Sequence, residues 1–352
     1  MSTSKRIYGL DILRAIAILC VLLGHGLGIL AHYLPEFVFK IIPDGVLLFF
    51  VLSGFLIGGI LLKTWDDHFT FAKLKNFWFR RWFRTLPAYF TVLIILIVAE
   101  IILSQRKDSL EYLQYFFFLQ NIKQGDARIF SESWSLTIEE WFYLSIPIAI
   151  FLSAKLTTFP KKKIVLFWVL FIIIIIAALR IYKAQFLKDV YVWDTYSRRA
   201  LITRIDCIMY GFLGAYLYYY KYPIWNKKNT LFLIGILIYV FNTSCSIIFG
   251  FGDYTRYLYL ITGSIAVLLV IPKLNTVKTG DGIIFKSITY ISTVSYSLYL
   301  INYSMYHIFI FPLSGNAFIR FFLFYLWAFV ASWILYKYIE QPFMNLRDRI
   351  TK

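Results

Sequence analysis

Long apolar runs recur from one end of this chain to the other, and each is about as long as a bilayer core is thick. Runs of about 17 to 25 residues form membrane-spanning helices, and their continuous apolarity differs from the alternating pattern of β-barrel strands. Apolar residues make up 60% of the 352 residues and charged residues only 16%, unlike an ordinary soluble domain. We therefore expect an all-α polytopic membrane protein with about ten transmembrane helices. The runs lie near residues 8–30, 43–62, 86–103, 134–154, 164–181, 200–220, 231–249, 255–271, 287–311 and 317–339.

Basic residues are distributed unevenly between the expected loops. With a cytoplasmic N-terminus, about 22 Lys and Arg fall on the cytoplasmic side and about 11 on the outer side. This excess predicts that both termini are cytoplasmic. The net charge of +17 then reflects topology and contact with anionic membrane lipid, so we expect no nucleic-acid partner. We expect residues 1–352 to form a single membrane domain with no appended soluble domain.

Two ionisable residues, Arg14 and His25, interrupt the first apolar run. On a helix they lie roughly 16 Å apart along the axis and within about 20° of one face. Ionisable groups inside a membrane are costly, and by default they mark a functional path. The alternative is that Arg14 pairs with Asp11 while His25 forms a hydrogen bond to a neighbouring helix.

Several other polar residues share the outer half of the membrane with His25 in this topology. Histidine titrates near neutral pH and carboxylates can orient or charge it, so the combination is typical of an acid–base site. Structural alternatives exist, because glutamates also favour helix N-termini and Arg204 could simply neutralise Asp206. The residues of this outer layer are His25, Glu139, Glu140, Arg204, Asp206 and Asn302.

The predicted cytoplasmic loop after the second span is rich in arginine. Arg81 and Arg84 are neighbours on one helical face, and Arg80 lies beside them. Planar guanidinium groups suit phosphate, although the positive-inside rule alone also explains a basic loop. In the second span, the small residues either let helices pack closely or leave a slot for a slender thioester arm. These residues are Ser53, Gly54, Gly58 and Gly59.

Seven segments together resemble the membrane O-acyltransferase family often called acyltransferase family three. They occur in the family's order and cover nearly the whole chain, on about ten expected spans. The segments are LRAIAILCVLLGH, DGVLLFFVLSGFLIG, RRWFRTLPAY, SWSLTIEEWFYL, RIDCIMYGFLGAYL, SYSLYL and YKYIEQPF.

The resemblance implies an enzyme in the cytoplasmic membrane of a bacterium. It would move an acyl group, usually acetyl, from cytoplasmic acyl-CoA (acetyl-CoA) to a hydroxyl of an envelope glycan, glycolipid or lipid-linked sugar. By resemblance, His25 would be the catalytic histidine and Arg14 its motif partner. Arg81 and Arg84 would bind the phosphates of coenzyme A, and Glu139 would support the site. Arg204 and Asp206 lie on a further recurrent motif.

One position departs from the family pattern. The SYSLYL segment often ends in a histidine where this chain has Asn302, which cannot accept a proton at neutral pH. Either Asn302 orients a ligand or His307 acts in its place. In the expected mechanism, Glu139 orients His25, which deprotonates the acceptor or carries the acyl group itself, while Arg204 or Asn302 stabilises the oxyanion.

Two other functional classes are also compatible with the sequence. A transporter or flippase could use the same charged residues without consuming thioester, and a non-catalytic scaffold or acyl relay is a third class. The acceptor sugar would be recognised by the outer loops 104–133 and 182–199, whose sequences do not indicate which sugar they bind. No Cys/His spacing indicates a metal site, and we expect Cys20, Cys207 and Cys245 to be inert thiols. A homo-oligomer and a monomer are both compatible with the sequence.

Overall fold

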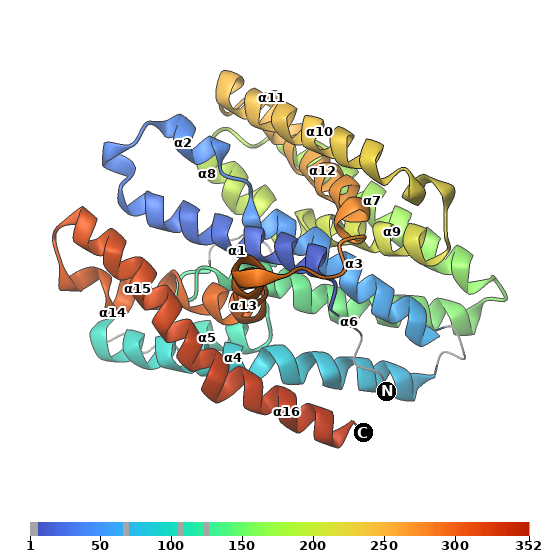
Figure 1. Cartoon of the computed structure of the whole chain (residues 1–352), viewed down its shortest axis with the longest axis horizontal. Coiled ribbons are helices and arrows are strands. Elements are labelled where there is room, and N and C mark those ends of the chain that lie inside the picture. Colours follow the sequence, from blue (N-terminus) through green and yellow to red (C-terminus); the bar gives the residue numbers. More distant parts are fainter. Residues whose placement is uncertain (1–5, 66–69, 105–108, 123–126, 352) are drawn as a thin grey trace.

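The computed structural model describes residues 6–65, 70–104, 109–122 and 127–351, and within them every regular element is a helix (Figure 1). The prediction of an all-helical membrane protein is confirmed. The expected outer loop 104–133 lies partly outside the described residues. The long helices are α1 (Tyr8–Ile29), α3 (Gly45–Trp65), α4 (Phe71–Ser104), α6 (Ser133–Leu156), α7 (Lys161–Ala184), α9 (Asp206–Tyr219), α10 (Lys228–Phe249), α12 (Tyr259–Leu274), α13 (Gly282–Ile301), α15 (Ala317–Leu335) and α16 (Gln341–Ile350). The short helices are α2 (Glu36–Ile41), α5 (Ser109–Phe116), α8 (Val190–Trp193), α11 (Asp253–Tyr257) and α14 (Ser304–Phe309).

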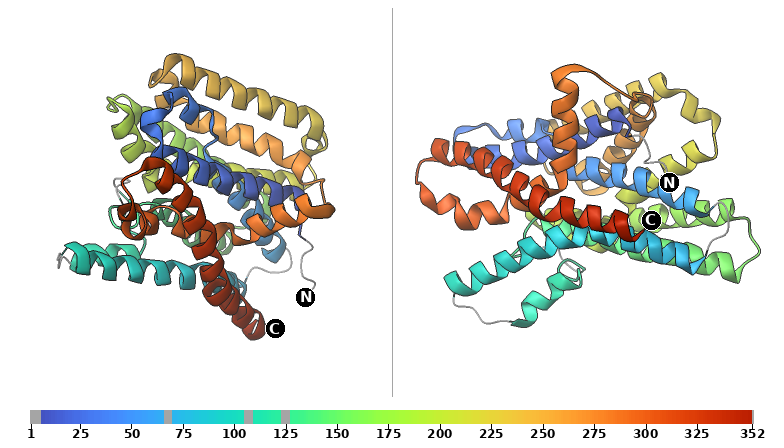
Figure 2. Two further views of the ribbon diagram at one scale, coloured as in Figure 1. Left: turned by 60° about the vertical axis from the view of Figure 1, so that its left-hand side comes forward. Right: turned by 60° about the horizontal axis from the view of Figure 1, so that its bottom comes forward.

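Seven helical segments among the described residues are long and apolar enough to cross a membrane. The count of ten spans and the side on which each terminus lies stay predictions. Helices α9 and α12 have only 14 and 16 residues, or about 21 and 24 Å, which is shorter than a bilayer core of about 30 Å. Helix α13 runs steeply across the other long helices (Figure 2), so it is not parallel to the candidate spans. These spans are Tyr8–Ile29, Glu36–Trp65, Phe71–Leu103, Ser133–Leu156, Lys161–Ala184, Lys228–Phe249 and Ala317–Ile350.

Glycines allow α3 to contact α9 backbone to backbone. A Cβ atom on Gly54 would lie 1.8 Å from the carbonyl oxygen of Ile208, and one on Gly211 would lie 1.9 Å from that of Val51. Gly58 faces the ring of Phe212 in the same interface. The small residues of α3 therefore pack helices, and the alternative of a ligand slot is wrong at Gly54 and Gly58, because α9 fills that space.

The expected basic loop before residue 86 is wrong from Phe71 onward, because α4 already begins there. Its 34 residues extend over about 51 Å, well beyond one hydrocarbon thickness. Figure 2 shows the later part of α4, with α5 beside it, projecting from the rest of the molecule. The arginines of this segment therefore lie on a helix packed against α16 and α6 instead of in a solvated loop.

Helix α1 lies in the middle of the molecule, packed against α3 on one side and α13 on another, while α10 and α12 lie side by side at one edge (Figure 1). Because α13 crosses α1, the residues that follow its C-terminal end come next to α1. This crossing brings the segment around residue 302 to His25.

Candidate functional site

His25 is held by an amide on another helix. Its Nδ1 atom lies 2.5 Å from Oδ1 of Asn302, which follows α13 and is fully buried. The Nδ2 group of Asn302 donates to the carbonyl oxygens of Leu298 (3.0 Å) and Tyr299 (2.7 Å). Since both amide protons are committed to carbonyls, Oδ1 must accept, and Nδ1 of His25 carries the proton. Within the described part of the chain, Nε2 has no hydrogen-bond partner.

The imidazole of His25 is the first of three aromatic rings that contact one another in turn. The ring of Tyr303 lies 4.7 Å from the imidazole between centroids, and the ring of His307 lies 4.6 Å beyond Tyr303. His307 is exposed and is separated from His25 by the tyrosine. The position where the family often has a histidine is thus occupied by an amide that contacts His25 directly, and His307 lies one aromatic ring farther away.

A carboxylate that sequence reasoning missed borders the same segment. Glu132 is 4% exposed and lies just before α6. Its carboxylate accepts from the backbone N–H of Ser304 at 3.1 Å and from the Ser304 hydroxyl at 2.5 Å. Burial raises the pKa of Glu132 to about 7, against the opposing effect of the Ser304 hydroxyl. Its place next to the SWSLTIEEWFYL segment was the available signal.

Glu139 lies elsewhere than expected. Its Oε2 accepts from the Tyr143 hydroxyl at 2.8 Å and lies 3.4 Å from Nη2 of Arg81. No hydrogen bond or ion pair joins it to His25 in the portion of the chain that the structure describes. The expected separation of Glu139 from the arginine layer is therefore wrong. The reason is geometric: α4 is longer than predicted, and Glu139 lies about two turns into α6.

Tyr143 connects several candidate residues. Its hydroxyl accepts from Nη2 of Arg81 at 2.5 Å and lies 2.6 Å from Oγ of Ser53. The guanidinium of Arg81 also lies over the Tyr143 ring, 4.2 Å from its centroid. Beside this network, Glu140 accepts a hydrogen bond from Thr85 at 3.2 Å. Ser53, Arg81 and Glu139 thus form one connected polar group.

Arg14 and Arg84 lie next to this group, and nearby carboxylates neutralise their positive charge only in part. Arg14 reaches Asp11 only at 3.8 Å, while Asp11 is held more closely by Arg6, at 2.8 Å. Arg84 has no hydrogen bond or ion pair to any described residue, although it interacts electrostatically with Arg14 and Arg81. The negative charge that compensates Arg84 electrostatically is the buried Glu340, on a π-helical turn after α15.

Arg80 points away from this cluster. Its guanidinium contacts Thr351 at 2.7 Å and Asp348 at 3.5 Å, and its side chain is half exposed. Of the three arginines expected to bind phosphate, Arg81 and Arg84 therefore face the polar interior of the molecule, and Arg80 faces the C-terminal helix.

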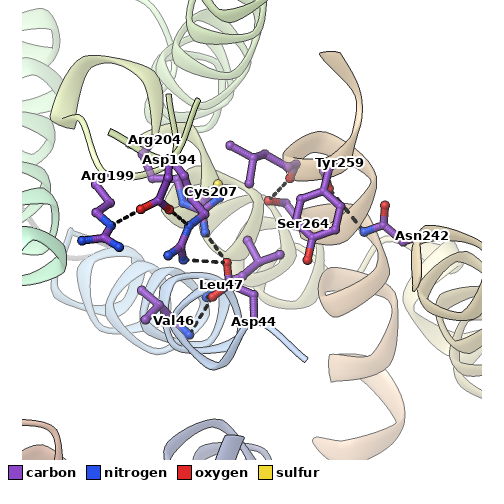
Figure 3. A network of polar contacts seen from close by, with 12 residues as sticks. Asp44, Val46, Leu47, Asp194, Arg199, Arg204, Cys207, Asn242, Tyr259 and Ser264 are labelled. Atoms are coloured by element: carbon purple, nitrogen blue, oxygen red, sulfur yellow. Dashed lines mark hydrogen bonds and ion pairs between the residues drawn. The ribbon is translucent and has the colours of Figure 1, made fainter. Parts of the chain in front are cut away.

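Arg204 and Asp206 do not neutralise each other, so that alternative is wrong. Arg204 donates to Asp44 at 2.9 Å, and Asp206 pairs with Arg180 on α7. Asp44 in turn accepts the first free N–H groups of α3, so the Arg204–Asp44 pair joins the start of α9 to the start of α3 (Figure 3). Figure 3 also shows Asp194 next to Arg199 in the same region.

The arginines before α9 add positive charge at the His25 end of the molecule. Arg198 and Arg199 share the carboxylate of Asp194, and both interact electrostatically with His25. Although burial opposes it, these two arginines hold the pKa of Asp194 below its usual range. Sequence reasoning did not single out these residues, because a basic loop carries no signal of what it will face.

Comparisons with known proteins identify the family of the chain. A family described as "Acyltransferase domain" matches residues 7–337. Two proteins of Staphylococcus aureus, strains COL and MSSA476, that carry the provisional name O-acetyltransferase are 29% and 30% identical over 86% and 84% of this chain, and over 51% and 50% of their own. The peptidoglycan O-acetyltransferase OatA of Listeria monocytogenes is 26% identical over 85% of this chain and 49% of its own.

No solved structure matches the chain. The chain spans about half the length of the curated relatives it matches. The family match covers nearly all of the helical bundle, including α1 with His25 and the α13 segment with Asn302. The chain therefore belongs to the membrane acyltransferase family known as acyltransferase family three.

Proposed function

We propose that this protein is a multi-pass O-acetyltransferase of a bacterial cytoplasmic membrane. It would take an acetyl group from cytoplasmic acetyl-CoA and place it on a hydroxyl of a cell-envelope glycan or lipid-linked sugar. The name of the Listeria relative, a peptidoglycan O-acetyltransferase, supports an envelope acceptor. The observation that carries the proposal is a histidine with a free Nε2 on the same helix as Arg14, which belongs to an arginine cluster completed by Arg81 and Arg84 of α4.

The arginine cluster, formed by Arg14, Arg81 and Arg84, would bind the anionic end of coenzyme A. Arg84 has no hydrogen bond or ion pair among the described residues, and Arg14 shares the carboxylate of Asp11 with Arg6. Guanidinium groups bind phosphate oxygens bidentately, and an anion would relieve the mutual repulsion of Arg14, Arg81 and Arg84. From there an extended thioester arm would run along α1, roughly 16 Å, to reach His25.

His25 would perform the proton transfer. In direct transfer, Nε2 removes the proton of the acceptor hydroxyl, the oxygen attacks the thioester carbonyl, and the C–S bond breaks. The proton on Nε2 then passes to the leaving thiolate, so the products are the O-acetyl ester and free coenzyme A. The same nitrogen could instead carry the acetyl group in a first step. Asn302 keeps Nδ1 protonated in both routes.

The test uses the purified full chain in lipid nanodiscs with acetyl-CoA and envelope glycan. We expect His25→Ala to abolish both coenzyme A release and glycan acetylation, whereas His32→Ala, at an exposed histidine, leaves both unchanged. Arg84→Gln should raise KM for acetyl-CoA with little change in kcat, and Arg349→Gln, at an exposed arginine of α16, should not. Near-normal acetylation by His25→Ala would refute the proposal, and glycan movement without coenzyme A release would favour a transporter.

A further inference from the structure

The break between α13 and α14 carries two residues that contact His25. Helix α13 ends at Ile301, and α14 begins at Ser304. Of the two residues between them, Asn302 binds Nδ1 of His25 and Tyr303 packs its ring on the imidazole. The geometry of this two-residue break therefore sets the position of the imidazole.

Ser131 and Glu132 form hydrogen bonds to the chain on both sides of this break. After the break, the Glu132 carboxylate accepts the N–H and the hydroxyl of Ser304, and the N–H of Ser131 donates to Oγ of Ser304 at 2.9 Å. Before the break, the Tyr299 hydroxyl donates to the backbone oxygen of Glu132 at 3.0 Å. The segment before α6 is thus hydrogen-bonded to Tyr299, three residues before Asn302, and to Ser304, two residues after it.

A carboxylate is a costly way to fasten this backbone. Burying an ionisable carboxyl costs several kcal/mol in desolvation, and a serine or asparagine could accept the same N–H at lower cost. A carboxyl group, however, offers two oxygens in one plane, and both can face the same pair of donors. Here the carboxyl oxygens fix the backbone and the side chain of Ser304 together.

We infer that Glu132 is a positioning residue for the acyl transfer: through Ser304 it fixes the helix break so that Asn302 keeps Nδ1 of His25 engaged and Nε2 free. This inference rests on the proposed role of His25. Glu132 acts through Asn302, since no hydrogen bond joins it to His25 among the residues that the structure describes. It is therefore distinct from a group that exchanges protons with the substrate.

A double-mutant cycle tests this route of action. In nanodiscs, Glu132→Ala and Asn302→Ala should each lower kcat by about 100-fold, the usual cost of misplacing a reacting group by about 1 Å. KM for acetyl-CoA should stay the same, because the arginine cluster lies at the other end of α1. If Glu132 acts through Asn302, the double variant is no slower than Asn302→Ala alone. Losses that multiply would overturn the inference.

Glu132→Gln separates positioning from proton transfer. Glutamine retains an acceptor for Ser304, so we expect it to recover most of the kcat lost in Glu132→Ala; a glutamine variant as slow as the alanine variant would contradict positioning. If Glu132→Ala does not fold, Ser304→Ala replaces it in the cycle, because it removes only the hydroxyl contact. Failure of the cycle while His25→Ala remains inactive would reject the positioning role and leave the proposed function intact.

Discussion

Replacement of Asp206 distinguishes a structural role from a catalytic one. Asp206 was a catalytic candidate from its sequence motif, but its carboxylate pairs with Arg180, and the two side chains are 0% and 1% exposed. In Asp206→Ala the guanidinium keeps one hydrogen bond, to the carbonyl oxygen of Thr203 at 3.1 Å, and its Nη1 already lacks a partner. Removing one partner of a buried pair costs about 3–5 kcal/mol, because the remaining charge is stranded.

The loss should appear as a lower thermal-unfolding temperature of the purified protein, compared at one heating rate because membrane proteins often unfold irreversibly. The matched control is Asp253→Ala: Asp253 is 85% exposed and lies 3.8 Å from Arg256, a pair worth about 0–1 kcal/mol. The combined variant Arg180→Met with Asp206→Leu should regain most of the stability and keep acetylation activity, because no unpaired charge remains. If Asp206→Ala instead melts like the parent protein but is inactive, Asp206 is catalytic and this reasoning is refuted.

Two further outcomes follow from close packing and from burial. Gly54→Ala should destabilise the protein by about 1–3 kcal/mol or more, since its Cβ would lie 1.8 Å from the Ile208 oxygen, whereas Gly59→Ala, with no atom within 4 Å, should not; equal melting temperatures would contradict this packing. Glu132 has its pKa raised by burial from 4.5 to about 7, so the folded state holds this proton more tightly than the unfolded state. Its stabilising contribution is complete below about pH 4.5 and is lost as the pH rises to about 7. The unfolding temperature of Glu132→Gln, measured from pH 4 to 8, should lack this component, and an unchanged profile would disprove it.

The local pattern of apolar residues was sufficient to predict which segments form helices. All ten apolar runs contain helix in the structure, because a continuous apolar stretch can satisfy its backbone in lipid only by forming intrahelical hydrogen bonds. Arg14 and His25 could be placed on one helix for the same reason. The basic segment before residue 86 was misjudged, since arginines that suggest a solvated loop are equally compatible with a helix.

Which charged groups meet depended on how the helices cross, and no property of a single helix encodes that. Glu139 meets Arg81 because α4 continues far beyond its expected start. Asn302 meets His25 because α13 crosses α1 instead of running parallel to it. Apolar periodicity reports only which segments avoid water, whereas an ion pair or a hydrogen bond needs atoms within about 3–4 Å of each other. That precision comes from the packing of many helices at once.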